Sequence, residues 1–89
     1  MKAIVTVLGK DTVGIIAAVC SLLSQYNVNV LDISQTILQD YFTMIMLVDV
    51  SAATIPFARL KEELAAAGEA RNLDIRIQRE DIFNAMHRI

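Results

Sequence analysis

The sequence predicts one α+β domain spanning residues 1–89, in which two helices cover one face of an antiparallel four-stranded sheet. Hydrophobic residues make up 55% of the 89 residues and the formal net charge is -2, which excludes a disordered chain. Apolar residues recur in some segments with the period of two of a strand and in others at the helical spacing of three and four. Each half of the chain has the order strand, helix, strand, and the length leaves no room for a second domain.

The first strand and the first helix open the domain. Residues 3–8 are rich in Val, Ile and Thr and end in a turn at Gly9, which is typical of a strand. An amphipathic helix is predicted over about residues 13–25, and either Asp11 or Thr12 can cap its first N–H groups. Its apolar residues are Ile15, Ile16, Val19, Cys20, Leu22, Leu23 and Tyr26.

Gly14 lies in the first turn of this predicted helix, where it lowers the intrinsic helix propensity. A residue without a side chain at this place has two interpretations. Either something approaches the backbone closely, or the helix packs tightly on the sheet. The sequence leaves both open.

Two strands joined by a hairpin follow the first helix. Apolar and polar residues alternate over residues 30–38, which predicts a strand with one face in water. The alternating residues are apolar Leu31, Ile33 and Ile37 and polar Asp32, Ser34 and Thr36. Residues 39–40 are short enough for a hairpin turn. Residues 41–48 are apolar on both faces, which predicts a strand in the middle of the sheet.

The second half of the chain adds a helix and the last strand. Residues 54–56 open the helix, because Pro56 is tolerated in a first turn, and Gly68 lies near the helix end. The helix has an apolar stripe of Phe57, Leu60, Leu64 and Ala67 and a charged face of Arg59, Lys61, Glu62 and Glu63. Alternation over residues 73–78 predicts an edge strand with one wet face.

A short C-terminal helix of about two turns completes the predicted fold. Its apolar side consists of Ile82, Phe83, Met86 and Ile89. A helix this short is marginal in water on its own, so its apolar side must pack against something.

Together these elements predict a ferredoxin-like βαββαβ sandwich, whose first and third strands are central. The alternation places Ile4, Thr6 and part of residues 41–48 on the sheet face without the two main helices. Either the C-terminal helix or another subunit must cover that face.

The residues present exclude several kinds of chemistry. The one His, His87, lies near the chain end and the one Cys, Cys20, lies in the first helix, so we expect no catalytic residues, no metal site and no cofactor. Tyr41 and Phe42 point to opposite faces beside Asp40, and the chain is acidic, so we expect no nucleic-acid partner. The protein is therefore predicted not to be an enzyme.

The sequence also bears on the location of the protein. Residues 12–31 carry no charge, but the polar residues Ser21, Ser24, Gln25, Asn27 and Asn29 interrupt them. We therefore expect no membrane span and no membrane partner. The start of the chain does not follow the pattern of a secretory signal, and a single Cys cannot form an intrachain disulfide. We expect a cytoplasmic protein.

The segment Asp11-Thr12-Val13-Gly14-Ile15 follows the first strand, and Asn27-Val28-Asn29-Val30 precedes the second. In this order and spacing, the two segments resemble the ACT domain family, the regulatory modules of amino-acid metabolism. The resemblance covers essentially the whole chain, since an ACT domain is a ferredoxin-like unit of this size. Residues 32–36, 41–44 and 82–89 are similar to a narrower group of small stand-alone ACT proteins, which is similar to the glycine cleavage repressor type.

The resemblance implies an amino acid bound between the loop after the first strand and a neighbouring subunit's helix and second strand. The ligand-binding residues that it implies are Asp11, Thr12, Val13, Gly14, Ile15 and Asn29. Independently of the resemblance, a Gly at a helix start exposes N–H groups to a carboxylate, and the helix dipole favours an anion there.

We therefore expect a non-enzymatic regulatory or sensing module that binds an amino acid or similar small metabolite at a homodimer interface. The small core, the apolar third strand and the predominance of two-fold dimers favour a second copy of the chain on physical grounds. The alternative is a protein-protein interaction module that docks on an enzyme or regulator and binds no metabolite.

Overall fold

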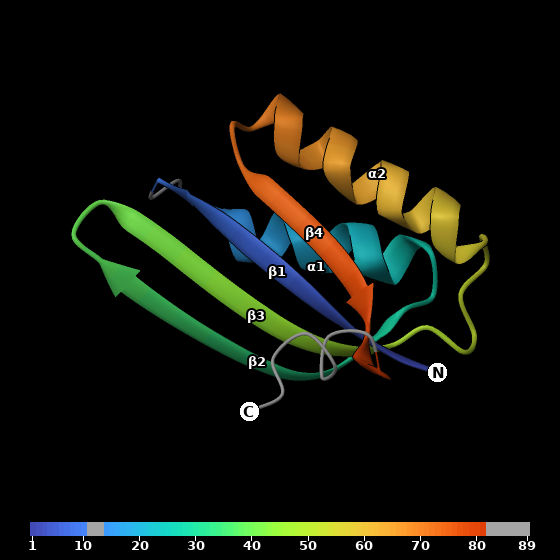
Figure 1. Cartoon of the computed structure of the whole chain (residues 1–89). Coiled ribbons are helices and arrows are strands. Elements are labelled where there is room, and N and C mark those ends of the chain that lie inside the picture. Colours follow the sequence, from blue (N-terminus) through green and yellow to red (C-terminus); the bar gives the residue numbers. More distant parts are fainter. Residues whose placement is uncertain (11–13, 82–89) are drawn as a thin grey trace.

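The computed structural model describes residues 1–10 and 14–81. Its elements are β1 (Lys2–Lys10), α1 (Ile15–Gln25), β2 (Asn29–Leu38), β3 (Tyr41–Asp49), α2 (Phe57–Ala70) and β4 (Asp74–Arg79). The strands form one antiparallel sheet in the order β2-β3-β1-β4, and both helices lie on the same face of it (Figure 1). The predicted ferredoxin-like fold is confirmed, with the first and third strands in the middle and the last strand at an edge.

The core lies between the helices and one face of the sheet. Alternate residues of β3, Phe42, Met44, Met46 and Val48, are buried, as are Ala3, Val5 and Val7 of β1. The helices contribute Val19 and Leu23 from α1 and Leu60 and Leu64 from α2, and β4 contributes Ile75 and Ile77. The apolar stripes predicted for both helices therefore face the sheet. The partly buried Cys20 packs against this core, as the sequence predicts for a thiol among apolar neighbours.

Both helices end in the same way, and each ending turns the chain back into the sheet. At the end of α1, the N–H of Val28 donates to the carbonyl of Leu23 over 2.9 Å and the N–H of Asn27 donates to Ser24 over 3.0 Å. This is a Schellman motif, and Asn27 adopts the left-handed conformation that it requires, with φ 59.

The end of α2 repeats this pattern. Leu73 donates to the Gly68 carbonyl over 2.7 Å, Asn72 donates to Glu69 over 3.3 Å, and Asn72 has φ 58. The two halves of the domain thus share one helix-to-strand turn.

Gly68 lies inside α2 and is buried, and the helix continues for two residues beyond it to Ala70. A Cβ built on Gly68 would lie 2.7 Å from the carbonyl oxygen of Leu73 and 2.9 Å from Cγ1 of Ile75. Leu73 leads directly into β4, and Ile75 lies within it. Gly68 thus lies near the helix end, as predicted, and it is also needed because the backbones of α2 and β4 approach closely there.

The structure corrects three details of the sequence analysis. The first helix begins at Ile15 rather than at residue 13, because Gly14 before it is left-handed with φ 86 and ψ 7. Pro56 precedes α2 in an extended conformation instead of lying within its first turn. The second strand does not have one buried and one wet face, because every side chain from Leu31 to Ile37 is exposed.

The exposure of β2 follows from its position at the sheet edge. A bulge between Val30 and Asp32 shifts the register, so Ile33 lies opposite Met46 and Ile37 lies opposite Phe42. These partners are buried under the helices, which places Ile33 and Ile37 on the helix face of the sheet. They remain exposed because the helices do not extend over this edge, and the β2–β3 hairpin reaches beyond them (Figure 1).

The predicted C-terminal helix of residues 82–89 lies outside the described residues. Glu80 and Asp81, just before it, are helical.

Candidate functional site

The start of α1 is the best candidate for a binding site. Gly14 is exposed, and no described atom lies within 4 Å of the position that a Cβ on Gly14 would take. The tight-packing interpretation of Gly14 is therefore wrong. The glycine instead permits the left-handed backbone from which the helix begins, and the space beside it is open.

The chemistry of this helix start favours an anion. The first N–H groups of a helix have no partner within the helix, and the aligned peptide dipoles give that end a partial positive charge. Among the residues that the structure describes, no acidic side chain lies in the first turn of α1 to neutralise this charge. A carboxylate is the ligand group that matches it.

The predicted site residues lie in different surroundings. Asp11, Thr12 and Val13 lie outside the described residues, and Gly14 lies at the N-cap of α1. The side chain of Ile15 is buried in the core, so only its backbone is available to a ligand.

Asn29 is exposed, but it lies at the other end of the sheet. Asn29 is opposite Asp49 of β3, which in turn is opposite Lys2 at the start of β1. We call this the N-terminal end of the sheet. Lys10, where β1 ends and the chain turns toward α1, is opposite Tyr41, which is opposite Leu38; we call this the hairpin end. A single chain therefore does not bring Gly14 and Asn29 together, since the 11 residues of α1, about 16 Å, run between the two ends.

The edge strand β2 is an exposed apolar surface that the sequence analysis did not find. Leu31 is 44% exposed, Ile33 41% and Ile37 64%. The outer edge of β2 also presents backbone N–H and C=O groups that pair with no other strand of the described residues. The alternating pattern could not reveal this exposure, because it shows which residues share a face but not whether a helix covers them.

A groove of about 700 Å³ lies between α1 and α2. Its walls include Ala17, Ala18 and Ser21 of α1 and Ala67 of α2, whose small side chains fill little of the space. Gly14 and Arg71 also line it. The groove thus extends from the start of α1 and offers room for a small molecule beside the candidate site.

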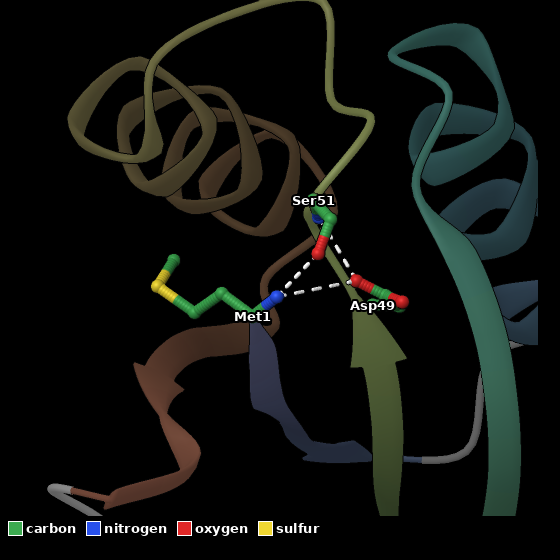
Figure 2. A network of polar contacts seen from close by, with 3 residues as sticks. All are labelled: Met1, Asp49 and Ser51. Carbon is green, nitrogen blue, oxygen red and sulfur yellow. Dashed lines mark hydrogen bonds and ion pairs between the residues drawn. The ribbon is translucent and has the colours of Figure 1, made fainter.

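The N-terminal end of the sheet carries a small polar network (Figure 2). The Met1 ammonium donates a hydrogen bond to the Ser51 hydroxyl and lies 3.6 Å from Oδ1 of Asp49, which also accepts a 2.9 Å hydrogen bond from the backbone N–H of Ser51. The hydroxyl and the backbone N–H of Ser51, followed by the ammonium group, hold the pKa of Asp49 below its ordinary value. This network fastens the start of β1 to the end of β3.

Two further findings bear on the chemistry of the described residues. Within residues 1–10 and 14–81, His, Cys, Asp and Glu form no group of three or more that could hold a metal ion. In the same part of the chain, neither helix is long and apolar enough to cross a membrane.

Known proteins resemble the chain over nearly its full length. The ACT domain family matches residues 2–78. A UPF0237 protein from Clostridium acetobutylicum is 55% identical over 89 residues, which is 100% of both chains. Another from Methanopyrus kandleri is 49% identical over 88 residues, 99% of this chain and 98% of the relative.

Solved structures agree with this result. An ACT domain protein from Streptococcus pneumoniae superposes with a TM-score of 0.82 at 44% identity, covering 93% of each chain. A protein assigned as a glycine cleavage system transcriptional repressor superposes with a TM-score of 0.75 at 24% identity. That match covers 88% of this chain and 44% of the other, and at this identity it shows the fold alone. The resemblance found in the sequence is confirmed, and the chain belongs to the ACT domain family.

Proposed function

We propose that the protein is a non-enzymatic regulatory module that binds an amino acid or a similar small metabolite at the interface of a homodimer. The observation that carries this proposal is the open space at Gly14, beside a helix start whose charge favours a carboxylate. Membership of a family of regulatory modules supports it.

The exposed β2 edge supports the dimer. A strand with free backbone groups and three exposed apolar side chains is well suited to pair with a second copy of itself. A two-fold axis at this edge would place the two β2 strands antiparallel and join the two sheets into one. The same contact would bury Leu31, Ile33 and Ile37, which a monomer leaves in water.

The dimer also explains how Asn29 can belong to the site. β1 and β2 both run from the N-terminal end of the sheet to the hairpin end. Antiparallel pairing of the two β2 strands would therefore bring the partner subunit's Asn29 to the hairpin end, beside Leu38. That is the end at which β1 leads into α1. The site would then be complete only in the dimer.

Each implied residue then has a physical role. The N–H groups at Gly14 and Ile15 would receive the ligand's carboxylate, and the Asn29 amide of the partner subunit would hydrogen-bond the ligand. Asp11 would pair with an ammonium group or, in the alternative, cap the helix. Thr12 and Val13 would complete the loop around the ligand.

A thermal-shift screen against the twenty amino acids tests the proposal. A ligand at about 100 times its Kd adds roughly 2.7 kcal/mol to stability, so a true ligand should raise the melting temperature clearly. Asn29→Ala should weaken binding by about 1 to 3 kcal/mol if its amide is a buried partner of the ligand. Reproducible turnover of a substrate by the purified protein would contradict the non-enzymatic part.

The second candidate is an interaction module that docks on an enzyme or regulator. The exposed apolar β2 edge favours it, because the same edge could pair with a strand of another protein. A screen in which no amino acid raises the melting temperature would favour this alternative. Neither candidate requires a nucleic acid, a membrane or a cofactor, and both are consistent with a cytoplasmic location.

A further inference from the structure

The sheet face opposite the two helices carries a strip of apolar side chains. In the register of the sheet, Ile4 lies opposite Leu47 and Thr6 lies opposite Ile45. Ile45 is 42% exposed and Leu8, farther along β1, is 45% exposed, while Ile4 and Leu47 are partly exposed. We call these four apolar residues, Ile4, Leu8, Ile45 and Leu47, the open-face strip.

Polar residues border the open-face strip on both outer strands. On β4, Asp74 and Arg76 form an ion pair of 3.1 Å, and on β2 Asp32 lies opposite Leu47. Around Ile4 and Leu47 the apolar surface is therefore confined to the two central strands. One helix laid across these strands would cover that part of the strip.

The chain itself supplies such an occupant. β4 ends at Arg79, which lies opposite Ala3 beside Ile4, and Glu80 and Asp81 are helical. Eight residues follow, and the sequence predicts that Ile82, Phe83, Met86 and Ile89 share one side of a helix. We propose that residues 82–89 continue the helix begun at Glu80 and pack this apolar side on the open-face strip.

The length of the segment fits this position. A helix of ten residues from Glu80 to the chain end is about 15 Å long. The distance from β4 across β1 and β3 to β2 is three strand spacings, about 14 Å. The helix therefore crosses the sheet once, over the neighbouring pair Ile4 and Leu47, with Ile45 two residues farther along β3, and ends near β2.

The charges fit the same direction. Acidic Glu80 and Asp81 lie at the helix start and basic His87 and Arg88 lie in its last turn, which is the arrangement that the helix dipole favours. The basic end would arrive at the β2 side of the strip, where Asp32 is located. With Ile4 and Leu47 covered from within the chain, the β2 edge remains exposed for a second copy.

Nuclear Overhauser effects in the full-length protein test the position directly. We expect contacts between the ring protons of Phe83 and the methyl groups of Ile45, Leu47 or Ile4. In a mixed sample of labelled and unlabelled chains, these contacts should arise within one chain. Absence of the contacts, or contacts only between chains, overturns the proposal.

A double-mutant comparison tests the energetics. Phe83→Ser and Ile45→Ser should each lower the melting temperature by about 4 to 8 °C, and the double variant should lose clearly less than the total of both. Ile33→Ser is a matched control, because Ile33 is 41% exposed, close to the 42% of Ile45, but lies on the other face. Its effect should add fully to that of Phe83→Ser.

Two outcomes of these measurements contradict the proposal. The first is full additivity of Phe83→Ser and Ile45→Ser. The second is a smaller assembly in sedimentation for Ile45→Ser than for wild type, because it would show that a second copy covers the strip.

Discussion

Single residues with unusual backbone geometry or close contacts decide several features of this protein. Gly14 and Gly68 look alike in the sequence, since each lies in or near a helix. The structure separates them, because Gly14 has φ 86 and open space around it, whereas a Cβ on Gly68 would lie 2.7 Å from the carbonyl oxygen of Leu73. Gly14 permits a left-handed backbone conformation, and Gly68 permits the close packing of α2 on β4.

The two glycines should therefore differ in whether Asn restores stability that is lost on substitution by Ala. Gly68→Ala should destabilise the fold by about 1 to 3 kcal/mol through overpacking, although Ala normally stabilises a helix interior. Gly14→Ala should cost about 1 to 2 kcal/mol for the left-handed backbone alone. Gly14→Asn should recover part of that loss, because Asn tolerates this conformation, and Gly68→Asn should recover nothing. Urea unfolding of the four variants measures this, and a harmless Gly68→Ala would contradict the close approach.

The polar network at Asp49 predicts a dependence of stability on pH. Because the folded-state pKa of Asp49 lies below the ordinary value of 3.8, its carboxylate stabilises the fold above that pH. The contribution is lost as the pH falls through the folded-state pKa. The melting temperature of wild type should therefore exceed that of Asp49→Asn at neutral pH, and the difference should disappear in strong acid.

Ser51→Ala is the companion variant. Removal of the hydroxyl raises the pKa of Asp49 toward its ordinary value, so the loss of stability should begin at a higher pH than in wild type. Melting curves at a series of pH values measure both effects. A difference between wild type and Asp49→Asn that stays constant with pH would show that the carboxylate does not interact in this way.

The elements of the fold are joined by two equivalent turns and bordered by one unusual edge. Asn27 and Asn72 end the two helices with the same hydrogen-bond pattern, which reflects the repeated strand-helix-strand order. β2 differs from β4, although both are edge strands. β4 buries Ile75 and Ile77 under the helix layer, whereas the side chains of residues 31–37 of β2 are all exposed.

The helix ends provide a matched pair of variants. Asn27→Ala and Asn72→Ala should each cost about 1 to 2 kcal/mol, because Ala disfavours the left-handed conformation. Asn72→Gly should be close to neutral. Asn27→Gly should cost more than Asn72→Gly, because Nδ2 of Asn27 also donates a 3.0 Å hydrogen bond to the Ala52 carbonyl. Equal effects of the two glycine variants in chemical unfolding would show that this hydrogen bond contributes nothing.

The β2 edge predicts how the dimer can be broken. Ile37→Lys places a charge at an exposed apolar position of the edge and should prevent pairing with a second copy. Wild type should sediment as a dimer at micromolar concentration, and the variant as a monomer of 9.9 kDa. Glu62→Lys on the exposed surface of α2 adds a lysine elsewhere and should leave the dimer intact. A dimeric Ile37→Lys variant would exclude this edge as the interface.

At the scale of the whole molecule, one chain supplies only part of each binding site that we propose. In one chain, Gly14 and Asn29 belong to opposite ends of the sheet, so a ligand that contacts both must lie between two copies. A small ACT domain of this kind would couple binding to assembly, because the ligand would stabilise the dimer that completes its site.

Complementation between two inactive variants tests this coupling. Gly14→Val should block the approach of a carboxylate to α1, and Asn29→Ala should remove the amide contact, so neither homodimer should bind normally. A mixed dimer has one site with Gly14 from one chain and Asn29 from the other, both intact. After equal mixing and exchange of subunits, about one quarter of all sites should bind with wild-type affinity. Calorimetric titration with a ligand identified in the screen measures this fraction, and no recovery on mixing would place both residues of a site in the same chain.

The sequence by itself determined the order of the elements and the fold class. Period two in residues 73–78 and the helical spacing of the apolar stripe in α2 predict strand and helix correctly, because burial on one face leaves a periodic record in the chain. The apolar residues on both faces of β3 also predicted its central position correctly. The two segments around Gly14 and Asn29 also indicated the ACT domain family, since their residue types depend on local turns and helix capping.

Only the tertiary structure decided where these residues lie relative to one another. The exposure of Ile33 and Ile37 depends on where the helices stop, and the separation of Gly14 from Asn29 depends on the strand register. The role of Gly68 depends on a contact with Leu73 and Ile75, on the segment after the helix end. Such features arise between segments that pack together, and a periodic pattern within one segment carries no information about how far another segment extends over it.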